Sequence, residues 1–365
     1  MNILLIANHL NVGGISSYLL TLARGLRQNG NNIYLASSGG ELLGKFVSSG
    51  IKYINVPLRT KQELSPKIIF SFFKLRKEAK RLNIDLIHSN SRTTQVLGNL
   101  LSRALAIPHI FTCHGFFQVK LSRLLFPCWG KAVIAISQEV KEHLISDLKL
   151  DGEKISVINN GIDTKNFGDF SARGDVRKEL GLGEAPLVGI IARLSDVKGH
   201  IYLIRAMPRV IANFSSVKLL IIGEGKMKTT LIKEVENLGI QGNILFIPEA
   251  RGSQDMLAAM DIFVMPSLQE GLGLALMEAM AQGLAVVGSR VGGIKTLIQD
   301  EVNGLLVEPA DVEGLTAAII RLLGDCHLRQ ALGANARKFI IDNFPQEKMI
   351  DTTEGIYKKC LEKKD

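Results

Sequence analysis

Short apolar runs alternate with amphipathic stretches along the first half of the chain. The apolar runs, which we expect to form strands, lie at residues 3–7, 33–36, 53–56, 85–88, 109–113, 133–136 and 155–158. Amphipathic stretches at 16–27, 66–82 and 91–105 have the period of helices. Strands that are apolar along their whole length and alternate with helices are typical of a parallel sheet covered on both faces.

The pattern breaks at residues 159–163, Asn-Asn-Gly-Ile-Asp, and stays rich in turns until about residue 186. We interpret this stretch as an interdomain linker, because it has little periodicity. Alternation then resumes. Strands are predicted at 187–192, 219–222, 244–247, 262–265, 285–288 and 305–307, and helices at 201–211, 226–238, 274–282 and 315–323.

We therefore predict an α/β protein of two doubly wound, Rossmann-like domains that face each other across a central cleft. A length of 365 residues exceeds what one hydrophobic core usually supports. The first domain is predicted to span residues 1–165 and the second 166–345, with a helix at 346–365 that packs back on the first. Ligands of such sheets bind beyond the carboxyl ends of the strands.

Composition agrees with a globular protein of the cytosol, since 46% of the residues are hydrophobic and 22% are charged. The apolar start of the chain is short and has no basic lead, so we expect a buried strand there and no signal peptide. No apolar run reaches the length of a membrane span. The four cysteines, at positions 113, 128, 326 and 360, lack metal-site spacing and are expected to be free thiols.

The net charge of +9 is concentrated in the first half. Residues 1–170 hold 21 Lys and Arg against 11 Asp and Glu, whereas residues 171–365 hold 23 against 24. A basic half attracts anionic lipid, nucleic acid or acidic glycans, or is simply a solvated surface.

Two stretches of that half mix cations with apolar and aromatic side chains, which suits a membrane interface. The stretch 66–82 contains Lys67, Lys74, Arg76, Lys77, Lys80 and Arg81 among Ile68, Ile69, Phe70, Phe72, Phe73 and Leu75. The stretch 116–129 contains Lys120 and Arg123 with Leu121, Leu124, Leu125, Phe126 and Trp129. We predict docking of the first domain on an anionic membrane surface; the alternative is an ordinary helix whose apolar face packs on the sheet.

Candidate chemistry in the second half follows two predicted strands. Arg193 and Lys198 come directly after the strand at 187–192, and two cations there suit a diphosphate. After the strand at 262–265 the chain reads Glu270-Gly271-Leu272-Gly273-Leu274, with Glu278 about one turn into the following helix. The two glycines expose backbone amides at a helix start, where a phosphate or a sugar oxygen can bind. Glu278 can accept hydrogen bonds from the two hydroxyls of a ribose.

Weaker signals lie elsewhere. Gly13 and Gly14 join the first strand to a helix and allow close approach of a ligand, although a tight turn is an equal explanation. His114 follows the strand at 109–113 and can donate a hydrogen bond to a sugar or phosphate. Gly223 and Gly225 form a compressed glycine turn after the strand at 219–222, which falls short of a full dinucleotide motif.

In order along nearly the whole chain, these positions resemble the retaining glycosyltransferases of family 4, which have the GT-B fold. Gly13-Gly14 is similar to the glycine loop of the family and His114 to its first-domain histidine. Residues 160–163 match its hinge "NGID", Arg193 and Lys198 its phosphate pair, and Gly223-Glu224-Gly225 its "GxG". Glu270 and Glu278 match the Glu-x7-Glu motif, and residues 287–293 and 303–307 match its last two blocks.

The resemblance implies a role for each position. Arg193 and Lys198 bind the phosphates of a UDP- or GDP-sugar, Glu278 the ribose and Glu270 the transferred sugar. Gly273 and Leu274 offer amides, and His114 contacts the sugar near its 6-position. Together with the glycine positions and Leu272, these residues form the predicted donor site. The implied activity is transfer of a hexose-type sugar, with retention, to a glycan or lipid-linked acceptor in cell-envelope polysaccharide or lipopolysaccharide synthesis.

No Asp-x-Asp occurs in the sequence, so we predict a reaction without metal or other cofactor. We also predict that the protein has no nucleic-acid partner. The predicted location is the cytoplasm, peripheral to the inner face of the membrane. One departure concerns Lys295-Thr296, which stand where the family usually has Pro-Glu. Two alternatives remain at this point, a nucleotide-sugar epimerase of the same fold and a non-catalytic binding protein.

Overall fold

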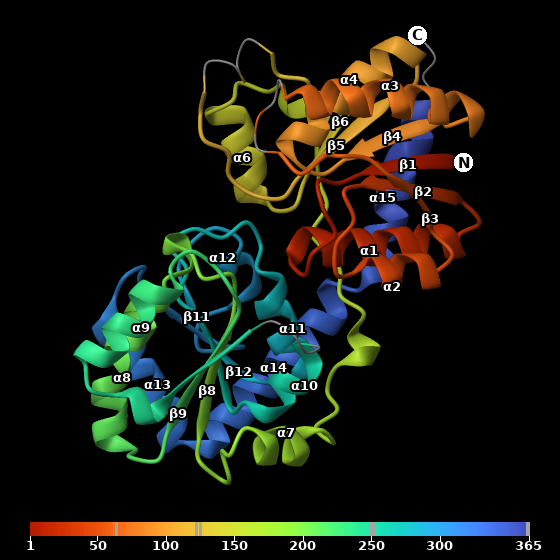
Figure 1. The fold of residues 1–365 in the computed structure, drawn as a ribbon. Helices are drawn as coiled ribbons and strands as arrows, with labels where there is room; N and C mark the ends of the chain where they lie inside the picture. Colours follow the sequence, from red (N-terminus) through yellow and green to blue (C-terminus); the bar gives the residue numbers. More distant parts are fainter. Residues whose placement is uncertain (61, 63–64, 121–122, 124–125, 249–252, 363–365) are drawn as a thin grey trace. The chain divides into compact units, whose positions relative to one another are not determined.

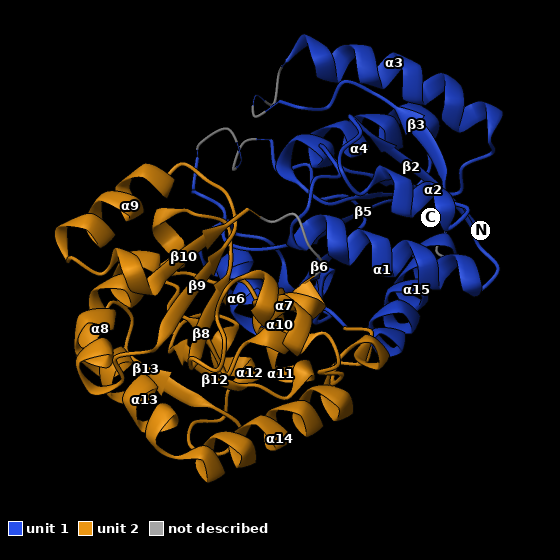
Figure 2. Ribbon diagram, turned by 60° about the horizontal axis from the view of Figure 1, so that its bottom comes forward, with its two compact units in different colours: residues 1–161, 346–365 blue, residues 162–345 orange. Residues whose placement is uncertain are grey.

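The protein is described from a computed structural model, which covers residues 1–365 except 61, 63–64, 121–122, 124–125, 249–252 and 363–365. The chain forms two compact units (Figure 2). Unit 1 consists of residues 1–161 and 346–365, and unit 2 of residues 162–345. The chain therefore leaves unit 1 after Gly161 and returns to it at Gln346.

Unit 1 is built on a parallel sheet of seven strands in the order β3-β2-β1-β4-β5-β6-β7 (Figure 1). Its strands are β1 (Asn2–Ile6), β2 (Asn32–Ser37), β3 (Lys52–Asn55), β4 (Leu86–Ser89), β5 (His109–Cys113), β6 (Ala132–Ala135) and β7 (Ile155–Val157). Its helices are α1 (Gly14–Gln28), α2 (Leu43–Ser48), α3 (Pro66–Arg81), α4 (Arg92–Leu105), α6 (Gln138–Ser146) and α15 (Gln346–Glu362), with a 3-10 turn at Gly152–Lys154. The strand order reverses between β1 and β4.

Side-chain alternation along β1 divides the core of unit 1 into two layers. Ile3 and Leu5 point into a cluster with α1 and α15, whereas Leu4 and Ile6 point into a cluster with α3 and α4. Both faces of the sheet are thus covered, which explains why its strands are mainly apolar.

The last helix, α15, is an integral part of unit 1. Tyr357 is fully buried there and its hydroxyl is hydrogen-bonded to Nδ1 of His88 on β4. Gly25 of α1 gives the helix room, because a Cβ at that position would lie 2.1 Å from Cδ1 of Ile350. Two helices can approach this closely only where one of them lacks a side chain.

Unit 2 is built on a parallel sheet of six strands in the order β10-β9-β8-β11-β12-β13. Its strands are β8 (Leu187–Ile191), β9 (Lys218–Ile222), β10 (Ile244–Ile247), β11 (Ile262–Met265), β12 (Ala285–Ser289) and β13 (Leu305–Val307). Its helices are α7 (Arg173–Glu179), α8 (His200–Asn213), α9 (Lys228–Asn237), α10 (Ser253–Ala259), α11 (Leu274–Gln282), α12 (Ile294–Leu297), α13 (Val312–Gly324) and α14 (Cys326–Asn343), with 3-10 turns at Thr164–Asn166, Asp196–Lys198 and Gln241–Asn243. The order reverses between β8 and β11. The predicted fold class, two Rossmann-like α/β domains with parallel sheets, is confirmed.

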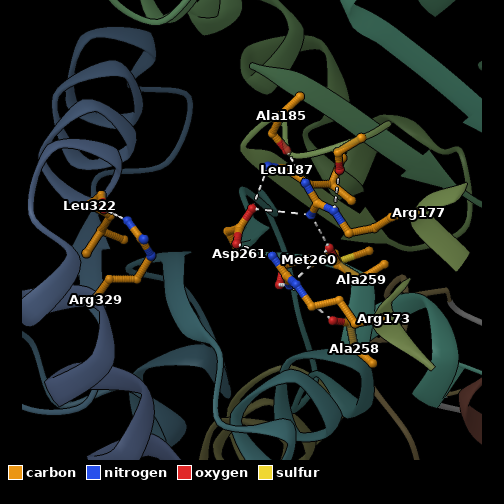
Figure 3. A network of polar contacts seen from close by, with 11 residues as sticks. Arg173, Arg177, Ala185, Leu187, Ala258, Ala259, Met260, Asp261, Leu322 and Arg329 are labelled. Carbon is orange, nitrogen blue, oxygen red and sulfur yellow. Dashed lines mark hydrogen bonds and ion pairs between the residues drawn. The ribbon is translucent and has the colours of Figure 1, made fainter. Parts of the chain in front are cut away.

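The interpretation of residues 159–186 as a linker is wrong, because most of the stretch belongs to unit 2 and includes α7. Two arginines anchor this helix (Figure 3). Arg173 donates to the carbonyl of Met260 at 2.9 Å and to Asp261 Oδ1 at 2.7 Å, and Arg177 donates to the carbonyl of Ala259 at 2.8 Å. Polar contacts rather than an apolar stripe hold α7, so its sequence shows no helical periodicity.

Within the described residues, no helix combines the length and the apolar character needed to cross a bilayer.

Candidate functional site

In unit 2, the predicted site residues gather where the strand order reverses. Arg193 and Lys198 follow β8, and Glu270 follows β11, its neighbour in the sheet. Parallel strands end at the same edge, so the two loops meet there. The amide of Leu268 donates to the carbonyl of Val197 at 2.8 Å. Backbone pairing of this kind fixes the relative position of the two loops.

Lys198 and Glu270 form an ion pair at the centre of this edge. The ammonium of Lys198 donates to Oε2 of Glu270, which Ser267 Oγ also approaches at 3.4 Å. Only 21% of the Lys198 side chain and 11% of the Glu270 side chain are exposed. The pair holds the ammonium at one point of the edge, where an anionic ligand meets a charge already in place.

Arg193, by contrast, is exposed and unengaged. Among the residues that the structure describes, it has no hydrogen-bond or ion-pair partner. Its exposed cationic neighbours differ in this respect, since Lys226 pairs with Asp196 at 3.1 Å and Lys228 with Glu224 at 3.0 Å. The guanidinium is therefore free to take a bidentate position on phosphate oxygens.

Helix α11 begins at the same edge. Gly273 caps it with φ +97°, a left-handed conformation that favours glycine, and its carbonyl accepts a hydrogen bond from Met277 at 3.0 Å. The first amides of a helix have no partner within the helix and carry partial positive charge. Leu274 is the first helical residue, and Gly271 and Leu272 are buried just before it. Glu278 lies one turn into α11 and is half-buried.

Several glycines of this edge serve close packing between loops. A Cβ on Gly199 would lie 1.8 Å from the carbonyl oxygen of Pro266. Gly223 and Gly225 pack equally closely, since a Cβ would lie 2.2 Å from the carbonyl oxygens of Ala192 and Leu194, respectively. These two glycines thus support the loop that carries Arg193, and the donor contact predicted for them stays a prediction.

Lys295 and Thr296 lie on α12, beside the same segment. The amide of Gly293 donates to the carbonyl of Glu270 at 3.1 Å, which places the start of α12 next to the Glu270 loop. Lys295 is exposed and Thr296 is half-buried. An exposed cation therefore stands where the family pattern has a carboxylate.

In unit 1, His114 lies at the carboxyl edge of the sheet, directly after β5, the strand next to β4. Its Nε2 is 3.0 Å from Asn90 Oδ1, and its ring meets that of Tyr18 edge-on, with the centroids 4.7 Å apart. Burial lowers the pKa of His114 to about 3, so the imidazole is neutral at physiological pH. Gly13 caps α1 with φ +147°, and Gly14 is the first residue of that helix. The donor contacts predicted for His114, Gly13 and Gly14 remain predictions.

Asn90 is a candidate that the sequence analysis missed. It follows β4, is only 2% exposed, and its Nδ2 has no partner in the described part of the chain. A buried amide nitrogen without a partner is a hydrogen-bond donor available to a ligand. The signal was the run Ser89-Asn90-Ser91-Arg92-Thr93 directly after a predicted strand, which places polar groups at the carboxyl edge.

Family comparisons cover both units. The pattern of the family described as Glycosyl transferases group 1 matches residues 173–339, and that of Glycosyltransferase Family 4 matches residues 12–166. The two matched stretches include the loops at the carboxyl ends of the strands, where the candidate site residues of both units lie.

Individual relatives give the same result. The chain is 30% identical to an uncharacterized glycosyltransferase of Methanocaldococcus jannaschii, over 76% of each chain. It is 29% identical to the UDP-Gal:alpha-D-GlcNAc-diphosphoundecaprenol alpha-1,3-galactosyltransferase of Escherichia coli, over 80% of this chain and 79% of the relative. The fold is similar to that of HepE from Anabaena, solved with UDP-glucose, with a TM-score of 0.88, 22% identity, and coverage of 98% of this chain and 100% of that one.

Proposed function

The chain belongs to the glycosyl transferases group 1 family, and from this premise we propose that it moves a hexose-type sugar from a UDP- or GDP-sugar to a hydroxyl of a glycan or lipid-linked acceptor. The proposal rests on one observation: Arg193, Lys198 and the first amides of α11 lie at the same edge of the sheet of unit 2. This edge is the switch point, where the strand order reverses between β8 and β11. Two names support it: the Escherichia coli relative is named for UDP-Gal and a diphosphoundecaprenol acceptor, and the Anabaena structure holds UDP-glucose. The relatives named above are glycosyltransferases, which favours sugar transfer over the epimerase alternative.

In the proposed reaction, the bond between the anomeric carbon and the diphosphate oxygen breaks, and the acceptor oxygen bonds to that carbon. The nucleoside diphosphate leaves with the bonding electrons, and the acceptor hydroxyl passes its proton to an oxygen of the departing diphosphate. Negative charge therefore grows on the phosphate oxygens in the transition state. Lys198 and the α11 amides stabilise that charge from positions that are fixed before the reaction begins. Arg193 adds a guanidinium that is free to move onto the phosphate oxygens.

The remaining groups orient the sugar. We assign Glu278 to binding the ribose hydroxyls and Glu270 to binding the transferred sugar. Because Glu270 is ion-paired with Lys198, the position of the sugar is tied to that of the phosphates that Lys198 binds. His114, being neutral, acts as a hydrogen-bonding group and not as an imidazolium. We propose retention of anomeric configuration by front-side attack, and a role in cell-envelope polysaccharide or lipopolysaccharide synthesis at the inner face of the cytoplasmic membrane.

A panel of nucleotide sugars in a thermal-shift assay tests the donor class. A donor present at about 100 times its dissociation constant stabilises the folded protein by about 2.7 kcal/mol, which raises the melting temperature. The matching sugar should then be transferred, with release of the nucleoside diphosphate. Stabilisation without any release of nucleoside diphosphate from any acceptor would favour the non-catalytic alternative.

We predict that transfer does not require a divalent metal. Support comes from the cations Arg193 and Lys198 and from the sequence, which has no Asp-x-Asp motif. Initial rates with excess chelator should match those without it. Activity that disappears with chelator and returns with magnesium or manganese would overturn this prediction.

A substitution at Glu278 separates donor binding from folding. Glu278→Ala should weaken binding of the free nucleoside diphosphate by roughly 1.5–3 kcal/mol, because a charge-assisted hydrogen bond to the ribose is lost. Isothermal titration calorimetry measures this change, and the melting temperature of the unliganded protein should stay close to that of the wild type. Glu236→Ala, which alters an exposed carboxylate on α9, is the matched control and should leave affinity unchanged. Equal affinities of the two variants would remove Glu278 from the donor site.

A further inference from the structure

Helix α3 has an apolar face on each side. Towards the sheet it buries Ile68, Leu75 and Ala79, which are 2%, 0% and 4% exposed, and this stripe attaches it to unit 1. On the opposite side Ile69, Phe70 and Phe73 are 58%, 60% and 62% exposed. Residues three and four apart share a helix face, so these three side chains form one patch. The fold does not need this patch, because the other stripe already packs.

Cations continue the same outer surface towards the end of the helix. The exposed cations of α3 are Lys67, Lys74, Arg76, Lys77, Lys80 and Arg81, against a single carboxylate, Glu78. Arg81 pairs with Glu78 at 2.6 Å, and Lys67 Nζ lies 3.5 Å from the carbonyl of Arg59. The first half of the outer face is thus apolar and the second half cationic. Figure 2 shows α3 along one side of unit 1.

We propose that this face of α3 docks unit 1 on an anionic lipid bilayer. Ile69, Phe70 and Phe73 enter the boundary between headgroups and acyl chains, and the cations that follow them contact lipid phosphates. Exposed apolar surface beside six cations and a single carboxylate is complementary to a surface that is apolar below and anionic above. Docking brings the enzyme to a lipid-linked acceptor, and only this last step rests on the proposed function.

Two other occupants fit the face less well. A second copy of the same face would bring six cations against six, and like charges in contact repel. A nucleic acid would contact the cations but would leave Ile69, Phe70 and Phe73 in water.

The second stretch that the sequence analysis assigned to the membrane, residues 116–129, is weaker evidence for docking than α3. Its Trp129 is only 8% exposed, and its ring centroid lies 5.9 Å from that of Phe111, so it is a core residue and that part of the prediction is wrong. Leu121, Leu124 and Leu125 lie outside the described residues.

Vesicle sedimentation of the full chain tests the docking. Wild-type protein should pellet with vesicles of phosphatidylcholine and phosphatidylglycerol, far less with phosphatidylcholine alone, and less as salt is raised. Phe70→Ser/Phe73→Ser should lower the partition coefficient by roughly tenfold or more, since two rings no longer leave water. Lys77→Ala/Lys80→Ala should lower it by roughly fivefold for each cation removed.

The matched control is Val47→Ser/Ile341→Ser, which removes exposed apolar side chains elsewhere, 53% and 40% exposed, and should pellet as the wild type does. Nucleoside diphosphate affinity and melting temperature should be the same in all variants, so that a failure of docking is not confused with a failure of the donor site or of folding. The proposal is overturned if the wild type does not pellet with anionic vesicles at low salt, or if Phe70→Ser/Phe73→Ser pellets as well as the wild type. It is also overturned if sedimentation velocity reveals a dimer that Phe70→Ser/Phe73→Ser dissociates.

Discussion

Replacing Lys198 by alanine is expected to lower kcat/KM for sugar transfer by roughly 10²- to 10³-fold, or about 2.7–4 kcal/mol of transition-state stabilisation. Two losses combine in this variant. The leaving diphosphate loses a fixed positive charge, and Glu270, only 11% exposed, loses the ion-pair partner that orients it. Initial rates over a range of donor concentrations measure the effect, and most of it should appear in kcat.

A double-mutant cycle with Glu270→Ala shows whether the two residues act together. Because each holds the other, Lys198→Ala/Glu270→Ala should be little worse than either single variant. Lys226→Ala is the control at the same edge, since this cation is exposed and pairs with Asp196 rather than with the Glu270 loop. Its activity should stay within about twofold of the wild type, because exposed ion pairs contribute little. A Lys198→Ala variant that retained wild-type kcat would remove the pair from the mechanism.

The largest effect on stability is expected from Arg177→Ala, which should lower the free energy of unfolding by about 3–5 kcal/mol. Arg177 is 5% exposed and donates to the carbonyls of Gly183, Ala185 and Ala259, while Asp261 lies 3.6 Å away (Figure 3). Removing the guanidinium takes a donor from the buried carbonyl of Ala259 and from the less buried carbonyls of Gly183 and Ala185.

Urea denaturation followed by circular dichroism measures this loss. Arg209→Ala serves as the control, since its pair with Glu313 is largely exposed and its removal should change stability by no more than about 1 kcal/mol. The effect should also reach the donor site, because Asp261 accepts from the amide of Leu187 at 2.8 Å and so fixes β11 against β8. Equal stability of the two variants would mean that α7 is held by other contacts.

The strands were predictable and several helices were not. Most strands are buried on both faces, so their sequences are mainly apolar, and all thirteen predicted strands occur within one or two residues of the observed bounds. The short helices α2, α7, α10 and α12 have too few turns to display a period, and α7 is held by arginines. The long helix α14 was also missed, because only Leu332, Gly333, Ala336 and Ile340 of its 18 residues are buried.

Where backbone geometry constrains the sequence, the placement of site residues was predictable, while their roles stay predictions. Arg193, Lys198 and Glu270 follow apolar strands directly, so their place at one edge follows from the parallel topology. The pairing of Lys198 with Glu270 was not predictable, because it depends on how the two loops pack. Asn90 was missed for a similar reason, since an unsatisfied amide is a property of its surroundings and not of its own sequence.

The return of the chain to unit 1 at Gln346 has a consequence for synthesis on the ribosome. Residues 1–161 emerge first, but the apolar face that receives Ile350 and Tyr357 stays uncovered until the last helix has been translated. Unit 2 is formed by one continuous segment and can fold as soon as it has been translated, while this surface of unit 1 is still exposed to water. A nascent chain stalled before residue 346 should therefore expose the apolar surface of an incomplete first domain, which α15 covers once it has been made.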